Sequence, residues 1–216
     1  MKKRLSKVTV ITTVLTMLPM VLGAVLYDRL PDVVATHWGF NGQPDGWSAK
    51  WMACFGIPGF MAAMNLIISV AMDISMATES GDKLNGTSKV VVNISRWIVP
   101  VLSIIMVPMM LFYELGYEMN VEKIVCTVMG VLFVVLGNYL PKCRRNYYVG
   151  IKLPWTLKSE ENWNKTHRLG GFVWMICGIL MLISAWAGTS WVTVAVLFAM
   201  ILVPCVYSYI LHRRGV

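Results

Sequence analysis

The stretch NYYVGIKLPWTLKSEENWNKTHRLGG, residues 146–171, is the longest polar interruption in the second half of a strongly apolar chain. It carries the densest run of Lys and Arg and lies between two long hydrophobic segments. Asn146 and Gly150 suit a turn, and Pro154 disfavours helix at the residue before it. The first part of the stretch is therefore predicted to be a loop that connects two apolar helices.

The second part of this stretch has the pattern of a helix. Ser159 is a favourable N-cap, and the two glutamates after it place negative charge where a helix start favours it. One face of the helix carries residues at spacings of three and four, namely Trp163, Thr166, His167 and Gly170. Gly170-Gly171 then permits a bend before the next apolar run. The pattern predicts a short amphipathic helix on the membrane surface, followed by a hinge.

Physical reasoning alone leaves two interpretations of this stretch open. In the first, it is a solvated connector whose tryptophans anchor at the lipid headgroups and whose cations set the orientation of the chain. In the second, its aromatic and basic residues form a surface that binds a partner.

The order of residues in the stretch resembles the signature of the SdpI family of bacterial immunity membrane proteins. The matching pattern is N-x-x-x-G-I-K-x-P-W-T-L followed by W-x-x-T-H-R-x-G-G. The family usually has Arg where this chain has Lys152, and Lys does not form the bidentate contacts that Arg forms. The resemblance implies a cytoplasmic motif that docks a partner, formed by Asn146, Gly150, Lys152, Pro154, Trp155, Thr156, Leu157, Trp163, Thr166, His167, Arg168 and Gly170.

The composition places most of the chain in a membrane. Of its 216 residues, 57% are hydrophobic and 14% are charged, unlike a soluble globular protein. A cleaved signal peptide is the alternative for the first apolar run, but its length and the lack of an A-x-A site favour a retained helix. The predicted fold class is all-α, a polytopic bundle of six membrane helices. The six runs are Val8–Leu26, Met52–Met72, Trp97–Tyr113, Ile124–Leu140, Phe172–Ala187 and Ser190–Leu211.

The net charge of +8 is distributed by side of the membrane. If the N-terminus is cytoplasmic, the inner segments, which include a polar loop at residues 73–96, hold 16 Lys and Arg residues, and the outer segments hold 3. An excess of cations on the inner side is the usual topology signal of membrane proteins. We therefore expect both termini in the cytoplasm, a location in the bacterial cell membrane, contacts with anionic lipid and no direct binding of nucleic acid.

The loop of residues 27–51 is the second informative stretch. It contains two turn signals, Asn41-Gly42 and Pro44-Asp45-Gly46. Its aromatic residues supply a belt at the outer interface. These are Trp38, Phe40, Trp47 and Trp51. We expect a compact, ordered loop that folds back on the helix ends.

The same loop resembles a small domain of unknown function (DUF1648) that often precedes the SdpI-type region. The pattern is L-P-D, then H-W, then N-G-Q-P-D-G-W-x-x-K. Aromatic anchoring and turn formation explain most of these residues, but not His37, Asp45 and Lys50, which either cap turns or bind a ligand. The candidate residues of the loop are Pro31, His37, Trp38, Asn41, Gly42, Asp45, Gly46, Trp47 and Lys50.

The residue inventory favours binding over catalysis or transport. His37 and His167 fall on opposite sides of the membrane in the predicted topology, so they cannot share a metal ion. The sequence has no H-E-x-x-H, no paired intramembrane carboxylates, no Ser nucleophile elbow and no C-x-x-C. Ion transport usually needs ionisable groups near the middle of a span, and the minor candidate for a proton or ion site is Glu114, at a helix end. We expect no enzyme activity, no cofactor and no metal; the alternative is a membrane enzyme or small-solute transporter with a cytoplasmic-face site.

The resemblance implies three parts and a protective function. The parts are an N-terminal two-helix unit (1–72), a third helix with flanking loops (73–122) and an SdpI-like region (123–216) with a cytoplasmic loop and helix (141–171). SdpI-like proteins protect the producing cell against a secreted toxic peptide that attacks its membrane. They also sense the peptide and hold an ArsR-type, winged-helix repressor at the membrane. The expected partners are therefore membrane lipid, a toxic peptide and a cytosolic repressor.

The charge distribution makes a direct prediction of topology. Reporter fusions after Lys50 and after Gly188 should behave as external, and fusions after Lys89 and Trp163 as cytoplasmic. Alkaline phosphatase activity marks an external fusion point, and green fluorescence marks a cytoplasmic one. An external signal from the fusion at Trp163 would reverse the side assigned to the main motif.

Overall fold

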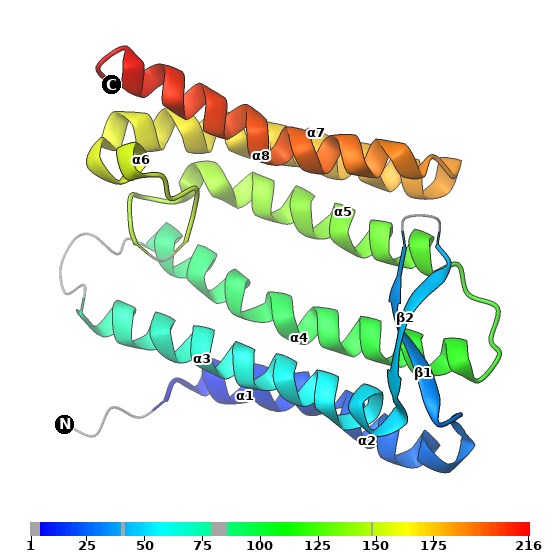
Figure 1. Ribbon diagram of the computed structural model, residues 1–216. Coiled ribbons are helices and arrows are strands. Elements are labelled where there is room, and N and C mark those ends of the chain that lie inside the picture. The colour runs from blue at the N-terminus through cyan, green and yellow to red at the C-terminus, as the bar shows by residue number, and fades with distance from the viewer. Residues whose placement is uncertain (1–4, 40–41, 79–85, 148) are drawn as a thin grey trace. The chain divides into compact units, whose positions relative to one another are not determined.

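The computed structural model describes residues 5–39, 42–78, 86–147 and 149–216 and is mostly helical (Figure 1). Its residues fall into two compact units. One is formed by Met1–Thr78 and Asn93–Glu122, and the other by Glu79–Val92 and Lys123–Val216. The first unit contains the loop of residues 27–51, and the second contains the stretch of residues 146–171.

The first unit combines membrane-length helices with a β-hairpin. Its elements are α1 (Lys7–Met17), α2 (Pro19–Leu26), β1 (Val33–Trp38), β2 (Pro44–Ala49), α3 (Ile57–Thr78) and, from residue 93, α4 (Gly86–Glu114). Pro19 separates α1 from α2 because it has no N–H to continue the hydrogen-bond ladder. A π-helical turn at Met52–Gly56 leads into α3. The hairpin lies at the end of the unit where α4 finishes (Figure 1).

The second unit is built from helices that pack side by side. Its elements are α5 (Val121–Tyr139), a 3-10 turn at Leu140–Lys142, α6 (Pro154–Lys158), α7 (Glu160–Ala187) and α8 (Ser190–Arg213). Gly188 ends α7 in the left-handed conformation, with φ of 68°, which glycine adopts without a Cβ clash. The chain then returns along α7, so α7 and α8 form an antiparallel pair (Figure 1).

Six helical segments among the described residues are long and apolar enough to cross a membrane. Each overlaps one of the six predicted runs, so the prediction of a polytopic helical membrane protein is confirmed, while the orientation of the termini stays a prediction. The all-α prediction fails at one place, because the outer loop forms two antiparallel strands. The six segments are Lys7–Arg29, Met52–Ile74, Val91–Glu114, Val121–Lys142, Glu160–Ala187 and Trp191–Arg213.

The third span begins earlier than the sequence predicts. Residues 73–96 were expected to form an inner loop, whereas α3 continues to Thr78 and α4 begins at Gly86. Arg96 therefore lies inside α4, with only 2% of its side chain exposed, and pairs with Asp73 at 2.8 Å. Thr9 Oγ1 donates to the same carboxylate at 2.7 Å. The ion pair makes the burial of Arg96 tolerable, because a lone charge there would be very costly.

A stripe of threonines on α1 holds the helices of the first unit together. Thr9, Thr12 and Thr16 are fully buried and lie on one helix face. Asn65 of α3 donates to Thr12 Oγ1 at 3.2 Å, and Ser103 of α4 donates to the Thr16 carbonyl oxygen at 2.8 Å. Hydrogen bonds between helices hold membrane bundles together where no water competes.

The threonines of α1 also donate within their own helix. Thr12 Oγ1 lies 2.9 Å from the Val8 carbonyl oxygen, and Thr16 Oγ1 lies 2.7 Å from the Thr12 carbonyl oxygen. Thr13 Oγ1 makes the same bond to the Thr9 carbonyl oxygen at 2.8 Å. A hydroxyl has one proton and two lone pairs, so Thr12 can donate within α1 and still accept from α3.

Glycines bring α5 and α7 into close contact. A Cβ on Gly178 would lie 2.7 Å from the Gly130 carbonyl oxygen, and a Cβ on Gly137 would lie 2.8 Å from the Gly171 carbonyl oxygen. Small residues at these points let two helix backbones approach each other. The hinge predicted at Gly170-Gly171 is therefore wrong: α7 runs unbroken through both residues, and the second glycine serves packing.

The short surface helix predicted from Ser159 is the first part of the same α7. The predicted cap is present, since the Asn162 amide donates to Ser159 Oγ at 3.1 Å. The helix is not a separate element, however, but continues without a break to Ala187. Trp163 and His167 face inward and are fully buried, so the amphipathic pattern marks a face covered by protein.

Candidate functional site

Trp163 and His167 form the centre of the motif in the second unit. The two residues are one turn apart on α7, so they share a face. Their rings stack with centroids 3.9 Å apart and 21° between the planes, and neither side chain is exposed. Val91, Cys143 and partly buried Leu157 pack in the same cluster.

Two backbone groups fix the protonation state of His167. Its Nδ1 lies 2.8 Å from the Trp163 carbonyl oxygen, and the Ile151 amide donates to its Nε2 at 2.9 Å. A carbonyl only accepts, so Nδ1 carries the proton, and Nε2 is unprotonated because it accepts. His167 is thus a neutral imidazole in a single tautomer. It connects the loop before α6 to α7 through the Ile151 amide, and neither ring nitrogen is free for proton transfer.

Gly150 allows the loop to approach the stacked rings. Its φ of 123° is a value that residues with a side chain rarely adopt. A Cβ on Gly150 would collide with His167 Nε2 and would lie 3.0 Å from the Trp163 ring. The glycine of the motif is needed both for its backbone conformation and for the missing side chain.

Cys143 and Asn146 fix the start of the loop. Trp163 Nε1 donates to the Cys143 carbonyl oxygen at 2.7 Å. Asn146 Oδ1 accepts from the Val149 amide at 2.8 Å, and its Nδ2 donates to the Arg144 carbonyl oxygen at 2.7 Å. Burial raises the pKa of the Cys143 thiol, so the thiol stays protonated at neutral pH and is a poor nucleophile.

A second buried network joins α6, α7 and α8. Asn162 is fully buried, and its Oδ1 accepts from Thr166 Oγ1 at 3.0 Å and from Ser208 Oγ at 2.7 Å. Trp155 Nε1 donates to the same Ser208 oxygen at 2.8 Å. Asn162 and Ser208 are not among the residues that the sequence singles out. The available signal was the position of Asn162 one turn before Thr166, on the face that the motif already marks.

The segment Pro154–Lys158 was predicted to be part of a loop, but it forms the short helix α6, which begins at the proline. Leu153, before the proline, is extended with φ of −108° and ψ of 155°. Thr156 Oγ1 accepts from the Leu153 amide at 2.8 Å and lies 2.9 Å from the Ile151 carbonyl oxygen, to which it donates. Thr156 therefore satisfies two backbone groups at the point where the loop turns into the helix.

The central members of the predicted docking motif are not on a surface. Trp163, Thr166 and His167 are fully buried because this face of α7 turns toward the loop and α8. Gly170 is also buried. The exposed members of the motif are Lys152, Pro154 and Arg168. A docking function for these three stays a prediction.

The candidate residues of the first unit lie on the β-hairpin. The strands pair with Trp38 opposite Pro44, and the register shifts on both sides of His37. His37 Nδ1 and Asp45 Oδ1 lie 2.5 Å apart on the exposed side of the hairpin. A Cβ on Gly46 would lie 2.9 Å from the His37 Cβ, so the glycine lets the strands approach each other at the irregular position.

Lys50 anchors the base of the hairpin. Its Nζ lies 3.0 Å from Asp32 Oδ1 and 5.1 Å from the centre of the Tyr27 ring. The hydrogen bond with Asp32 raises the pKa of Lys50. His37, Asp45 and Lys50 thus each have a partner within the loop, and the binding of a ligand by these residues stays a prediction.

Trp38 and Glu114 tie the hairpin to α4. The Trp38 ring packs edge-on against the Tyr113 ring with centroids 5.5 Å apart. Glu114 Oε1 accepts from the Ala35 amide at 2.7 Å. The carboxylate that the sequence left as a candidate proton or ion site therefore holds a strand in place.

The remaining candidates of the hairpin have separate positions. Pro31 is exposed before β1, and Trp47 has 59% of its surface exposed. Gly42 has φ of 71°, as a turn signal of the Asn-Gly type predicts. Asn41 lies outside the described residues. Trp47 therefore remains available to lipid or to a ligand.

The two sets of residues differ in what they can do. In the second unit most motif residues satisfy buried backbone groups, and in the first unit the hairpin presents exposed side chains. Within the described residues, no group of three or more His, Cys, Asp and Glu side chains could hold a metal ion. The arrangement suits a binding surface on a rigid support.

Known proteins resemble the chain in both regions. Residues 142–208 match the SdpI/YfhL protein family, and residues 14–62 match a domain of unknown function (DUF1648). The immunity protein SdpI of Bacillus subtilis (strain 168) is 23% identical over 202 residues, which cover 94% of this chain and 92% of that protein. No solved structure matches the chain. Both resemblances seen in the sequence are thereby confirmed.

The geometry predicts that the motif is part of the core of the second unit. Trp163→Phe removes the donor to Cys143 and should lower the free energy of unfolding by about 1–3 kcal/mol. His167→Ala should cost about 3 kcal/mol or more, because it opens a cavity and leaves the Ile151 amide without an acceptor. Arg168→Ala, at an exposed position, should not change the melting temperature in detergent. Unchanged melting of the first two variants would contradict a core role.

A glycine pair provides the matched control for the loop. Gly150 and Gly188 both have positive φ, but only a side chain at Gly150 meets neighbouring atoms. Gly150→Ala should therefore lower the melting temperature more than Gly188→Ala does, since both carry the backbone strain and only one carries the collision. Equal losses would mean that the loop does not press against the rings.

Proposed function

We propose that this protein is an immunity protein of the SdpI type, which protects the cell that carries it against a secreted peptide that attacks the membrane. The observation that carries the proposal is the similarity to the immunity protein SdpI, which extends over 94% of the chain. The two family regions occur in the expected order. The six membrane-length helices are consistent with a protein that acts where such a peptide acts.

The geometry supports protection by binding. His167 has both ring nitrogens engaged, and the Cys143 thiol stays protonated because burial raises its pKa, so neither is prepared to cleave a peptide. The accessible groups of the first unit are on the hairpin, where Trp47 is exposed and the His37–Asp45 pair faces outward. In the predicted topology this hairpin is on the outer side, where a secreted peptide arrives.

Expression of the protein should confer resistance without destroying the peptide. Sensitive cells that carry the gene, and cells that carry an empty vector, are challenged with a membrane-active peptide produced by a related bacterium. We expect a higher inhibitory concentration for the first cells and intact peptide in both media, measured by mass spectrometry. Specific fragments that appear only with this protein would contradict binding and support a membrane protease.

We further propose that the protein senses the peptide and holds a winged-helix repressor of the ArsR type at the membrane. The exposed members of the motif are the residues that a cytosolic partner can reach, since Trp163 and His167 are buried. Besides Lys152 and Arg168, the exposed cations of the second unit include Arg144 and Arg145. Such a basic surface favours a partner with an acidic face.

Site-specific crosslinking tests this second proposal. A photoreactive amino acid replaces Lys152 or Arg168, and Tyr117, exposed in the first unit, is replaced as the control. We expect a crosslink to a small winged-helix protein from the first two positions, in cells exposed to the peptide, and none from the control position. Crosslinks to lipid alone at all three positions, with or without peptide, would reject repressor binding.

A further inference from the structure

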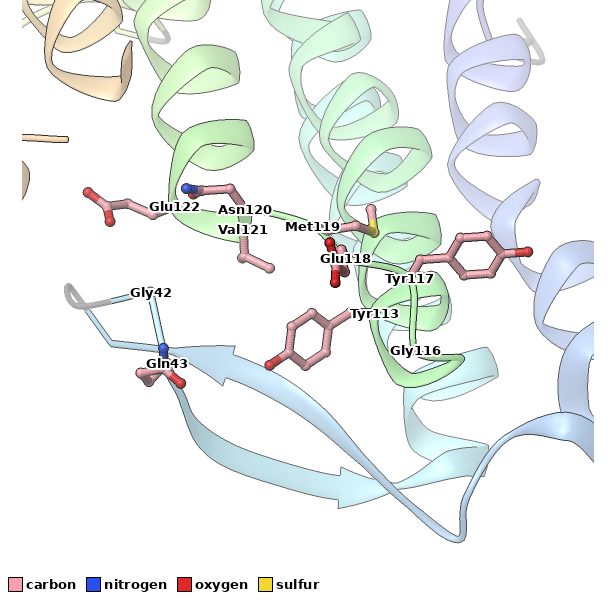
Figure 2. Close-up of a pocket in the computed structure, with 10 residues that line it drawn as sticks. All are labelled: Gly42, Gln43, Tyr113, Gly116, Tyr117, Glu118, Met119, Asn120, Val121 and Glu122. Atoms are coloured by element: carbon pink, nitrogen blue, oxygen red, sulfur yellow. The ribbon is translucent and has the colours of Figure 1, made fainter. Parts of the chain in front are cut away.

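The hairpin and the segment after α4 flank an open hollow of about 710 Å³ in the first unit (Figure 2). Gly42 and Gln43, next to β2, line one side. Tyr113 at the end of α4 and Glu118, Asn120 and Glu122 after it line the other. In Figure 2 the Tyr113 ring extends from α4 toward Gln43, and Glu118 lies on the connecting segment beside it. The volume is in the range of small-ligand sites, ~300–1,000 Å³.

Both sides of the hollow are fixed to the end of α4. On the hairpin side, the Ala35 amide donates to Glu114 Oε1, and Trp38 packs on Tyr113. On the other side, Gly116 ends the helix with φ of 85° and donates to the Tyr113 carbonyl oxygen at 3.0 Å. The hollow is thus built by two segments that the same helix positions, and it does not depend on a chance contact between loops.

The lining carries negative charge. Glu118 and Glu122 are its charged residues, and it contains no Lys, Arg or His. Within the described part of the chain neither carboxylate forms an ion pair or a hydrogen bond. The Tyr113 hydroxyl adds a group that can donate or accept. Such a lining favours an ammonium or guanidinium group, which brings both positive charge and several donors.

The two sides of the hollow have different relations to the family regions. The hairpin side lies within residues 14–62, which match DUF1648, whereas residues 113–122 lie outside both matched regions. One side is therefore part of the shared domain, and the charged side belongs to a segment that neither family describes.

We propose that this hollow binds a lysine or arginine side chain, or the amino terminus, of the peptide against which the protein protects. The inference rests on the proposed function for the identity of the ligand as a peptide. Its chemical part, the recognition of a cationic group by Glu118 and Glu122, rests on the hollow alone.

The test uses the full-length protein in phosphatidylcholine nanodiscs, which carry no net charge. The probes are a short fluorescent oligo-arginine peptide and a matched, uncharged oligo-glutamine peptide. We expect saturable binding of the first probe that weakens with added salt, and no binding of the second. Glu118→Gln and Glu122→Gln should each weaken binding of oligo-arginine by up to about fivefold, and the double variant by more, because each removes one exposed ionic contact.

Glu160→Gln is the matched control. It removes the same charge from an exposed position at the start of α7, in the other unit, and should bind oligo-arginine as the unmodified protein does. Equal melting temperatures of all variants exclude unfolding as the cause. The proposal is overturned if the double variant binds normally, if the control weakens binding as much, or if oligo-arginine does not bind.

Cell assays separate this inference from the proposed function. The double variant, present at normal level, should lose resistance to a peptide that contains lysine or arginine. If it keeps resistance, the hollow is not the peptide site, although the immunity function stands. If the unmodified protein gives no resistance but binds oligo-arginine through Glu118 and Glu122, the immunity function fails and the cation site stands.

Discussion

The conformation of the loop of residues 143–153 depends on hydrogen bonds between its buried backbone groups and side chains of α7. The Ile151 amide donates to His167 Nε2, and the Cys143 carbonyl oxygen accepts from Trp163 Nε1. Leaving a buried donor or acceptor without a partner costs about 1–3 kcal/mol. The tryptophan and the histidine of the motif supply these partners, and Gly150 has no side chain to hold the loop away. Trp163, His167 and Gly150 therefore act together to hold the loop against α7, and replacing any one of them weakens the contact that the other two support.

In both units, the residues that stabilise the fold are different from the exposed residues that a partner could contact. In the second unit the most recognisable positions face inward, and exposed positions such as Lys152 and Arg168 surround them. In the first unit Trp38 and Glu114 hold the hairpin on α4, and Trp47 on the same hairpin is exposed. The buried residues thus set the shape of each unit, and the exposed residues are the ones that a partner can reach.

The sequence predicts the spans well because length and apolar composition are sufficient for them. It fails where the decisive neighbour is distant in the chain. Gly170-Gly171 looks like a hinge locally, but α7 continues through both residues and packs closely against Gly137 of α5. The charge of Arg96 suggests a position in a loop, but its ion pair with Asp73 allows it to be buried within a helix. The amphipathic pattern identified the right face of α7, but periodicity cannot say whether that face meets water, lipid or another part of the chain.

The β-hairpin is a second case in which local sequence patterns were not sufficient to predict the structure. Of the two turn signals, the one at Gly42 lies between the strands as predicted, whereas Pro44-Asp45-Gly46 was predicted to be a turn and instead belongs to the strand Pro44–Ala49. Strands usually avoid glycine and proline. The pairing of this strand with β1 is supported by contacts that local propensity does not include, such as the bond from Ala35 to Glu114. The candidate ligand residues His37, Asp45 and Lys50 were identified as unusual, but their partners became visible only in three dimensions.

The threonines of α1 have a consequence for the biogenesis of the protein. Thr12, Thr13 and Thr16 donate to carbonyl oxygens of their own helix, whereas Asn65 and Ser103, their neighbours on α3 and α4, are synthesised later. When α1 leaves the ribosome and enters the bilayer, the hydroxyl protons of these three threonines are therefore already engaged within the helix. Thr9, near the start of α1, donates instead to Asp73 of α3. Oxygen lone pairs of α1 remain free to accept hydrogen bonds from Asn65 and Ser103 once α3 and α4 have been inserted. The helix α1 can thus be inserted into the membrane before α3 and α4, in spite of its polar face. The same face then provides the acceptors to which α3 and α4 bind.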